Sequence, residues 1–494
     1  MIILKLIGHE YFNEVSDIIK MFYGKESIKP YDSIENYEDM QGILLTSEII
    51  IDDELTSFIS SYKDLKNNSN NSYTFTKNGK VIDPREIKKA LKVSMYKLLS
   101  DITGHNIAWG ILTGIRPVKI VHKLFEEGMN EEQIIAHLKD EYYVTEDRAL
   151  LSIKVAQVEK KYISKNDNNK IGIYIGIPFC PSRCNYCSFT SNAIDKNRDL
   201  VQPYLEALML EIRTVSEYLK SRGVTAQSVY IGGGTPTSIN ADELSTLIQC
   251  VNEFWGQNEE FTCEAGRPDT ITVDKLKAMK ESGITRLSIN PQSMDDDTLM
   301  RIGRKHTHTQ IIKSFLLARE LGFDNINMDM ILGLPGEGLD QVDNTLNWMN
   351  RLNPENVTVH TLAIKRASVY NEMNLDTRSH NDIVYKMMEL ARNKLENNQY
   401  YPYYLYRQKY MAQNLENIGF CKKDRECIYN IQIMEEKQSI VAFGADAVTK
   451  AYFPEEDRLE RQHNIKDLRL YIKNIDSQIN KKVDLLSKLY VNNF

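Results

Sequence analysis

The sequence lacks the features that would place it in a membrane, outside the cell or on nucleic acid. No apolar stretch among its 494 residues approaches the roughly 18 that a membrane span requires. Residues 1–14 lack the basic and apolar segments of a secretory signal. With a net charge of −7, basic residues are interspersed among acidic ones, whereas nucleic-acid binding requires clustered Lys and Arg. We therefore expect a cytoplasmic protein with no membrane span and no nucleic-acid partner.

Cysteine is also scarce, and three of the seven cysteines lie in one short stretch. Cys180, Cys184 and Cys187 have the spacing C-x3-C-x2-C and directly follow an apolar run, residues 171–177, that is typical of a strand. Clustered thiols bind a metal centre or form disulfides. Three ligands suit an iron–sulfur cluster with one open iron, whereas structural zinc takes four. The odd cysteine count is typical of a reducing compartment.

The other four cysteines do not predict a second metal site. Cys250 falls in an expected helix and Cys263 in an expected strand, where cysteine is typically a small buried residue. Cys421 and Cys427 lie six residues apart with no nearby His to complete a zinc site. The sequence thus predicts one metal centre.

Residues 166–380 alternate between short strands and helices. We expect strands at 171–177, 228–231, 261–264, 286–289, 326–331 and 356–361, with helical patterns between them. This alternation predicts an α/β fold in which about six parallel strands form an open, partial β/α barrel. The site of such a barrel is expected at the carboxyl ends of its strands.

Two further regions flank this barrel. Residues 1–165 are expected to form an α+β domain of unknown role, with strands at 43–51 and 72–76 and helices at 84–103, 117–127, 130–142 and 145–164. Residues 109–119 contain two Gly and one Pro, which leaves open a packed bend or a lid. Residues 381–494 are expected to form a C-terminal capping region, with a helix at 382–397, a strand at 439–443 and a helical segment over the last forty residues.

Residues with useful chemistry follow every expected strand. They are the three cysteines, the Gly-Gly-Gly-Thr-Pro-Thr segment at 232–237, Glu264, Asn290 to Gln292, Asp329 with 333–336, and His360 with 363–366. The Gly triplet lets backbone approach a ligand closely, but it matches neither a dinucleotide-binding nor a P-loop motif. Each group alone could be a turn, a helix cap or a solvated side chain. Their common position at strand ends favours a ligand site.

These motifs resemble those of the radical S-adenosylmethionine (SAM) superfamily. The likeness rests on the three-cysteine motif with Tyr186 before its last Cys, on the segment at 232–237 and on Gly-Leu-Pro-Gly. Within the superfamily, the sequences at 177–180, 286–293 and 327–336 resemble the oxygen-independent coproporphyrinogen III oxidase group, and its HemZ-type members most.

The resemblance implies a [4Fe–4S] cluster on Cys180, Cys184 and Cys187, with SAM bound at the open iron as the source of a 5′-deoxyadenosyl radical. A reduced flavodoxin- or ferredoxin-type protein would donate the electron. Tyr174 is implied as a catalytic residue that faces the cavity. By their positions in the motifs, the implied SAM contacts are Tyr186, Gly233, Gly234, Thr235, Glu264, Gln292, Arg304, Asp329 and Ala363.

The implied reaction is oxidative decarboxylation of two propionate side chains, which converts coproporphyrinogen III to protoporphyrinogen IX. Lys365, Arg366 and Arg267 are candidate partners for the substrate carboxylates. Gly176 stands where the oxidases carry His, and Phe189 stands where they carry a fourth cysteine. Heme-trafficking relatives of the same family carry Phe at that second position. A heme carrier and another radical reaction on a tetrapyrrole are therefore alternatives. A structural zinc domain would not explain the residues at the strand ends.

Overall fold

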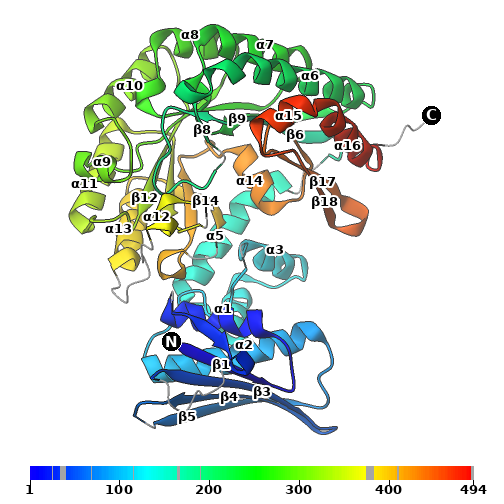
Figure 1. The fold of residues 1–494 in the computed structure, drawn as a ribbon, viewed down its shortest axis with the longest axis vertical. Coiled ribbons are helices and arrows are strands. Elements are labelled where there is room, and N and C mark those ends of the chain that lie inside the picture. The colour runs from blue at the N-terminus through cyan, green and yellow to red at the C-terminus, as the bar shows by residue number, and fades with distance from the viewer. Residues whose placement is uncertain are drawn as a thin grey trace. The chain divides into compact units, whose positions relative to one another are not determined.

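The computed structural model describes residues 1–24, 26–33, 41–67, 69–114, 116–163, 167–189, 191–365, 367–373, 383–408 and 411–490. The chain forms two compact units, which are described separately here (Figure 1). The first contains Met1–Ile153 and Arg407–Leu415, and the second contains Lys154–Leu375, Asp382–Tyr406 and Glu416–Phe494. None of the helices within the described ranges is long and apolar enough to cross a membrane.

The first unit contains a five-stranded sheet in the order β2-β1-β3-β4-β5. Strand β1 pairs in parallel with β2 and β3, and the remaining pairs are antiparallel. The strands are β1 (Ile2–Ile7), β2 (Ile28–Pro30), β3 (Ile43–Ile51), β4 (Leu55–Asp64) and β5 (Asn70–Asn78). The helices are α1 (Phe12–Tyr23), α2 (Pro84–Thr103), α3 (Val118–Glu126), α4 (Glu131–Tyr142) and the first half of α5 (Glu146–Ile163).

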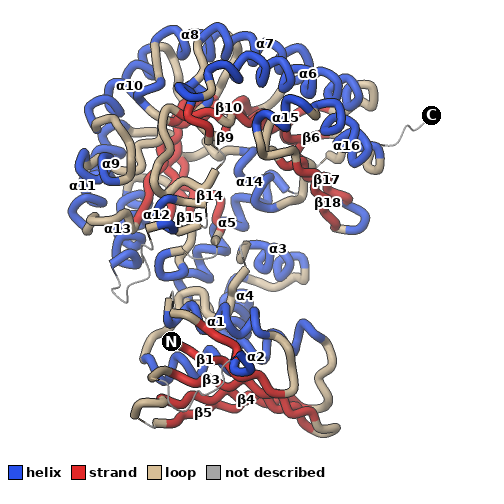
Figure 2. The backbone as a smooth tube through the Cα atoms, in the orientation of Figure 1, coloured by secondary structure: helices blue, strands red, loops and turns tan. Residues whose placement is uncertain are grey.

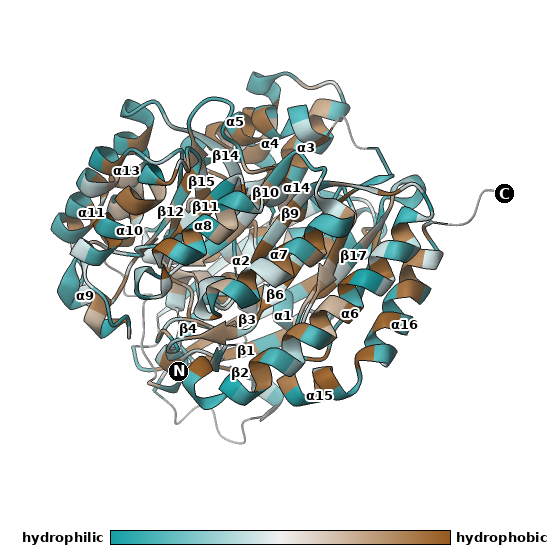
Figure 3. Cartoon of the chain, turned by 90° about the horizontal axis from the view of Figure 1, so that it is seen from above, coloured by the Kyte–Doolittle hydropathy of each residue, from teal (hydrophilic) through white to brown (hydrophobic). Residues whose placement is uncertain are grey.

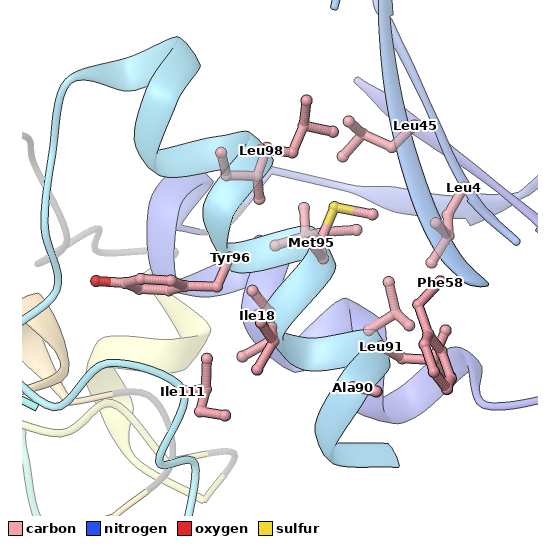
Figure 4. Packing of buried hydrophobic residues seen from close by; sticks show 14 of the residues in the cluster. Leu4, Ile18, Leu45, Phe58, Ala90, Leu91, Met95, Tyr96, Leu98 and Ile111 are labelled. Atoms are coloured by element: carbon pink, nitrogen blue, oxygen red, sulfur yellow. The ribbon is translucent and has the colours of Figure 1, made fainter. Parts of the chain in front are cut away.

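Helix α2 forms the centre of this unit's core. Its buried residues Leu91, Met95 and Leu98 lie with side chains from α1 and from the sheet (Figure 4). The helix begins where Asp83 accepts a hydrogen bond from a backbone N–H of the first turn. It ends at Gly104, whose φ of 68° is a left-handed conformation that glycine adopts without strain.

The sequence predicts the helices of this unit better than its strands. Helices α2 to α5 and strands β3 and β5 are confirmed to within two residues at most ends, but β1, β2 and β4 are not predicted. On β4, Ser60 is fully buried and accepts a hydrogen bond from the Ser94 hydroxyl of α2 at 2.9 Å. A buried hydroxyl that is satisfied in this way interrupts the apolar alternation by which strands are recognised.

The second unit contains an eleven-stranded sheet in the order β14-β15-β13-β12-β11-β10-β9-β6-β16-β17-β18. The seven strands from β13 to β16 in this order are mutually parallel, and the outer strands pair antiparallel. The strands are β6 (Lys170–Ile177), β9 (Thr225–Gly233), β10 (Glu260–Gly266), β11 (Arg286–Ile289), β12 (Ile326–Leu332), β13 (Asn356–Thr361), β14 (Tyr401–Tyr406), β15 (Asn417–Cys421), β16 (Ile440–Phe443), β17 (Val448–Phe453) and β18 (Arg458–His463).

An arc of helices follows the parallel strands of this sheet (Figure 2). The helices that connect the strands are α6 (Val201–Lys220), α7 (Ala241–Trp255), α8 (Val273–Glu281), α9 (Asp296–Arg301), α10 (His308–Glu320) and α11 (Leu339–Leu352). The later helices are α12 (Val369–Glu372), α13 (Ile383–Asn397), α14 (Ile428–Glu435), α15 (Leu468–Lys473) and α16 (Ile475–Ser487). Hydrophilic and hydrophobic segments alternate along α6, α7 and α16, as expected of helices with one buried face (Figure 3).

All six parallel strands expected in this unit are confirmed, and they lie in the neighbouring order β6-β9-β10-β11-β12-β13. The fold is therefore mixed α/β. The expectation that the last forty residues are helical is wrong in part, because β18 lies among them. Among the described residues this strand pairs with β17 alone, and its sequence, Arg-Leu-Glu-Arg-Gln-His, has three exposed and three half-buried residues. An exposed edge strand needs no apolar face, so its pattern gave no strand signal.

A fully buried ion pair joins α6 to α16. The Lys482 ammonium lies 2.5 Å from a carboxylate oxygen of Glu211, and both side chains have no exposed surface. Glu211 also accepts hydrogen bonds from the Gly444 backbone N–H (2.9 Å), the Tyr471 hydroxyl (2.7 Å) and the Asn464 amide (2.8 Å). These extra partners satisfy the buried carboxylate, which a single ion pair would not do.

We expect Lys482→Met to lower the free energy of unfolding by about 3–5 kcal/mol, because it leaves the Glu211 carboxylate buried without its counter-charge. The measurement is urea unfolding followed by circular dichroism. Arg213→Gln is the matched control, since Arg213 lies on α6, the helix of Glu211, and forms an exposed pair with Glu253 of α7. We expect this variant to lose less than about 1 kcal/mol. Equal losses in the two variants would contradict this assignment.

Candidate functional site

The predicted site residues come together at one edge of the parallel sheet. Strands β6, β9, β10, β11, β12 and β13 run in the same direction, so their carboxyl ends share that edge. Cys180 follows β6, Gly233 ends β9 and Glu264 lies near the end of β10. Asp329 lies on β12, and Gln292 forms an isolated parallel bridge with Met330 of the same strand.

The segment from 178 to 189, which we call the cysteine loop, holds the three clustered thiols. Cys180 lies in the two-residue strand β7 (Phe179–Cys180), which pairs with β8 (Asn192–Ala193). Cys180 and Cys184 are buried, Cys187 is half-buried, and all three are free thiols. Asn185 fixes the middle of the loop, because its backbone N–H donates to the carbonyl of Ile302 at 3.0 Å.

Burial raises the pKa of two of these thiols. Burial raises the pKa of Cys180 to about 11, although the Thr235 hydroxyl donates a hydrogen bond to its sulfur at 3.5 Å and opposes that rise. Burial also raises the pKa of Cys187. Because metal ligation requires thiolates, a bound metal centre must itself supply the charge that ionises them.

The glycine triplet after β9 lies directly against the cysteine loop. Gly233 has a φ of 109°, and the Gly234 N–H donates to the Ile177 carbonyl at 2.8 Å. A Cβ at Gly234 would lie 2.6 Å from the Phe179 carbonyl oxygen and 3.0 Å from the Cys180 sulfur, which is too close for any side chain. Only glycine therefore allows this contact between the two strand ends.

Two carboxylates inside the site have opposite pKa shifts. Burial raises the pKa of Glu264 to about 7, while the Tyr230 hydroxyl, which donates to it at 2.6 Å, opposes the rise and Asp329 adds to it. Burial also acts to raise the pKa of Asp329, but hydrogen bonds from His360 and Asn327 outweigh burial and lower it. The site thus holds one carboxyl group whose pKa is about 7, Glu264, and one carboxylate that stays ionised at neutral pH, Asp329.

Gln292 offers a buried acceptor to a ligand. Its φ of 68° is unusual for a residue with a side chain, and two backbone hydrogen bonds hold it beside β12: its N–H donates to Asp329 and its carbonyl accepts from Ile331. Only 7% of the residue is exposed, and its side-chain oxygen has no hydrogen-bond partner within the described structure. Such an orphaned buried oxygen, on a residue whose backbone N–H bonds the Asp329 carbonyl, suits a ligand that carries hydroxyl groups.

Arg304 links the cysteine loop to the end of β11. Its buried guanidinium donates to the Tyr186 hydroxyl at 3.1 Å and to the Asn290 carbonyl at 2.5 Å. Arg304 is therefore not the solvated surface cation that its sequence context alone would allow. It brings Tyr186 to the same edge as Gln292.

Tyr174 belongs to a stack of three tyrosines that sequence reasoning did not find. Its ring lies 6.3 Å from that of Tyr230 on β9 and 6.1 Å from that of Tyr429 on α14, and the latter two rings are 4.4 Å apart. Tyr230 pairs with Tyr174 across β6 and β9, so strand register could have indicated it. Tyr429 lies about two hundred residues further along the chain, so no local sequence pattern could have indicated that it joins the stack. Ala363 is half-buried just after β13.

The candidate cations for substrate differ in their availability. Arg267 is committed elsewhere, because its guanidinium binds both carboxylate oxygens of Asp269 and contacts Ser182. The Lys365 ammonium lies 5.7 Å from the centre of the Phe189 ring, and burial lowers its pKa. Arg366 lies outside the described residues. Of the two described cations, Lys365 is the one whose described contacts leave it able to meet a ligand.

The residues at this edge fit a [4Fe–4S] cluster with SAM. Three free thiols gather on one loop, the glycine turn exposes backbone beside them, and Gln292 and Asp329 present acceptors for ribose hydroxyls. Cys250 and Cys263 are buried free thiols, as expected, and Cys421 and Cys427 are buried as well. Cys427 donates to a carboxylate oxygen of Glu260 at 3.2 Å.

Comparison with known proteins gives the same assignment. The model of the Radical SAM superfamily matches residues 174–349. The oxygen-independent coproporphyrinogen-III oxidase-like protein HemZ of Bacillus subtilis (strain 168) is 39% identical over 417 residues, which are 82% of this chain and 82% of that relative. The heme chaperone HemW of the same organism is 32% identical over 280 residues, 56% of this chain and 69% of HemW.

A solved structure shares the fold. Coproporphyrinogen III oxidase (HemN) from Escherichia coli, whose structure is described as that of a radical SAM enzyme, matches with a TM-score of 0.52 at 22% identity. The match covers 66% of this chain and 73% of HemN. Membership of this superfamily implies a [4Fe–4S] cluster and SAM. The chain belongs to the radical SAM superfamily and is related to its coproporphyrinogen-III oxidase-like members.

Proposed function

We propose that this protein is a radical SAM enzyme that oxidatively decarboxylates coproporphyrinogen III to protoporphyrinogen IX in the cytoplasm. The observation that carries the proposal is the strand-end site, where three free thiols share one edge with the orphaned oxygen of Gln292 and the Asp329 carboxylate. The relationship to HemZ over four-fifths of both chains supports the choice of substrate. A flavodoxin- or ferredoxin-type protein would supply the electron. We further propose that the six parallel strands form a partial barrel around the site.

Each part of the site would have a distinct task. Cys180, Cys184 and Cys187 would hold the cluster, which, once reduced and with SAM bound, supplies the 5′-deoxyadenosyl radical. Gln292 and Asp329 would accept hydrogen bonds from the ribose hydroxyls of SAM. Gly233, Gly234 and Thr235 would offer backbone to its methionyl end, where Glu264 and Arg304 add polar groups, and Tyr186 and Ala363 would lie near its adenine.

The tyrosine stack would line the cavity beside the cluster. The stack presents the apolar ring faces of Tyr174, Tyr230 and Tyr429. All three keep their hydroxyl protons, because burial is the main cause that raises the pKa of each. Such a wall excludes water from the neighbourhood of a radical and gives a planar tetrapyrrole an aromatic surface. Tyr174 is the member nearest to the cysteine loop in sequence, and we propose it as the catalytic residue of this wall.

A heme carrier of the same superfamily is the second candidate function. The observation that favours it is Phe189, which is 67% exposed on the cysteine loop and lies under the Lys365 ammonium. An exposed ring beside a cation suits the face and a propionate of heme. The resemblance to HemW is consistent with this alternative.

One anaerobic assay separates the two functions. The protein is reconstituted with iron and sulfide, given SAM, a reductant and coproporphyrinogen III, and the tetrapyrrole products are weighed by mass spectrometry. The proposal predicts loss of two carbon dioxide units per substrate molecule. SAM cleavage with unchanged substrate, together with stoichiometric binding of added heme, would instead establish the carrier.

We expect Cys184→Ala to abolish the broad iron–sulfur absorbance near roughly 400 nm after reconstitution, because the cluster loses one of three protein ligands. Cys250→Ala is the matched control, since Cys250 is a buried free thiol on α7 outside the site, and it should keep the band. Retention of the full band in Cys184→Ala would exclude this loop as the cluster site.

We expect Gln292→Leu to weaken SAM binding by about tenfold while leaving the iron content unchanged, because it removes a hydrogen bond of about 1–1.5 kcal/mol. Equilibrium dialysis of reconstituted protein with labelled SAM measures this directly. Gln249→Leu, at an exposed position on α7, controls for a general effect of the substitution. Unchanged SAM affinity in the Gln292 variant would remove this residue from the SAM site.

A further inference from the structure

A buried arginine contacts the middle of the cysteine loop. Arg267 follows β10, and only 3% of it is exposed. One guanidinium nitrogen donates to both the hydroxyl (2.8 Å) and the backbone carbonyl (3.2 Å) of Ser182. Ser182 lies midway between Cys180 and Cys184. The other two guanidinium nitrogens, Nε and Nη2, donate to the carboxylate of Asp269 at 3.0 and 2.7 Å.

We call Arg267 and Asp269 the clamp, and Asp269 has a further buried neighbour. Asp269 lies 3.4 Å from Nδ1 of the buried His306, and His306 comes two residues after Arg304, which contacts Tyr186. Two buried guanidinium groups therefore hold the loop on either side of Cys184: Arg267 through Ser182 and Arg304 through Tyr186. The fork geometry of each arginine restricts the loop in a way that a lysine ammonium would not.

The position of Arg267 gives it an electrostatic effect as well. Its Nη1 faces the cysteine loop, whereas its carboxylate partner is bound on the Nε and Nη2 side. A buried cation is screened little by solvent, so it stabilises negative charge on nearby sulfur.

We propose that Arg267, oriented by Asp269, is a positioning residue that presents Cys180 and Cys184 to the cluster and raises the cluster's reduction potential. The potential rises because reduction adds one negative charge, which a neighbouring cation stabilises. The inference rests on the cluster assignment in the proposed function and is independent of the tetrapyrrole reaction.

The test measures the bound cluster itself. Wild-type protein and the variants Arg267→Gln, Arg267→Lys and Asp269→Asn are reconstituted without oxygen, their iron content is determined, and each cluster is titrated with reductant while electron paramagnetic resonance reports the reduced form. The exposed fork between Arg198 and Glu243 supplies the matched control, Arg198→Gln. None of these measurements uses coproporphyrinogen, so failure of the decarboxylation assay leaves them interpretable.

The two charge variants should shift the potential in opposite directions. In Arg267→Gln the ratio of reduced to oxidised cluster at a fixed potential should fall about tenfold, which for one electron corresponds to 59 mV. In Asp269→Asn, which leaves the cation without its counter-charge, it should rise. Arg267→Lys should keep a potential near that of the wild type but bind less iron, because the guanidinium contact with Ser182 is lost.

Three results would overturn the inference. They are unchanged potentials in both charge variants, shifts in the same direction in both, and a shift in Arg198→Gln as large as that in Arg267→Gln. A purely structural role would lower the iron content in all three clamp variants and leave the potential of the remaining cluster unmoved. If Arg267→Gln does not fold, the sign of the shift in Asp269→Asn and the potential of Arg267→Lys still decide the question.

Discussion

The site depends on one close contact, between the glycine turn after β9 and the start of the cysteine loop after β6. Strand register sets this contact, because Gly176 pairs with Gly232 and Ile177 with Gly233. The chain then turns at Gly234 against Phe179 and Cys180, where a Cβ would lie 2.6 Å from a carbonyl oxygen. Two elements that the sequence separates by about fifty residues thus form one surface, and the other strand ends extend it.

The sequence predicts this surface well wherever the signal is local. Cys180, Cys184 and Cys187, the glycine triplet and the six parallel strands all have short-range patterns, and the structure brings them to one edge. The supporting residues have no such pattern. Tyr429 reaches the stack from α14, and Arg267 was expected to meet substrate, whereas its fork is occupied by Asp269 and Ser182. Long-range packing and the choice of hydrogen-bond partner are tertiary properties that composition and spacing do not encode.

The balance of charge at the strand ends favours a cationic ligand next to the cluster. Asp329 is ionised and Glu264 titrates near neutral pH, while Arg267 and Arg304 are used to hold the cysteine loop. SAM carries a sulfonium and an ammonium group, which would offset these carboxylates. A tetracarboxylate substrate of the proposed kind would need other cations, and Lys365, which follows β13, lies beside Phe189 of that loop. The proposed cofactor and the proposed substrate would therefore need different electrostatic surroundings within one site.

The C-terminal part of the chain supports the cysteine strand directly. Strand β16 pairs in parallel with β6 on the side away from β9, so β6 lies between two strands instead of at an edge. The Tyr204 hydroxyl donates to the Gly176 carbonyl at 2.5 Å and accepts from the Ala445 N–H. The carboxylate of Glu211, neutralised by Lys482, binds the Gly444 N–H in the same turn. A Cβ at Gly176 would lie 3.5 Å from both the Phe443 carbonyl oxygen and the Tyr174 ring. The buried ion pair therefore fixes the turn that packs against Gly176. Because Gly176 has no side chain, the Tyr174 ring can lie close to it on β6.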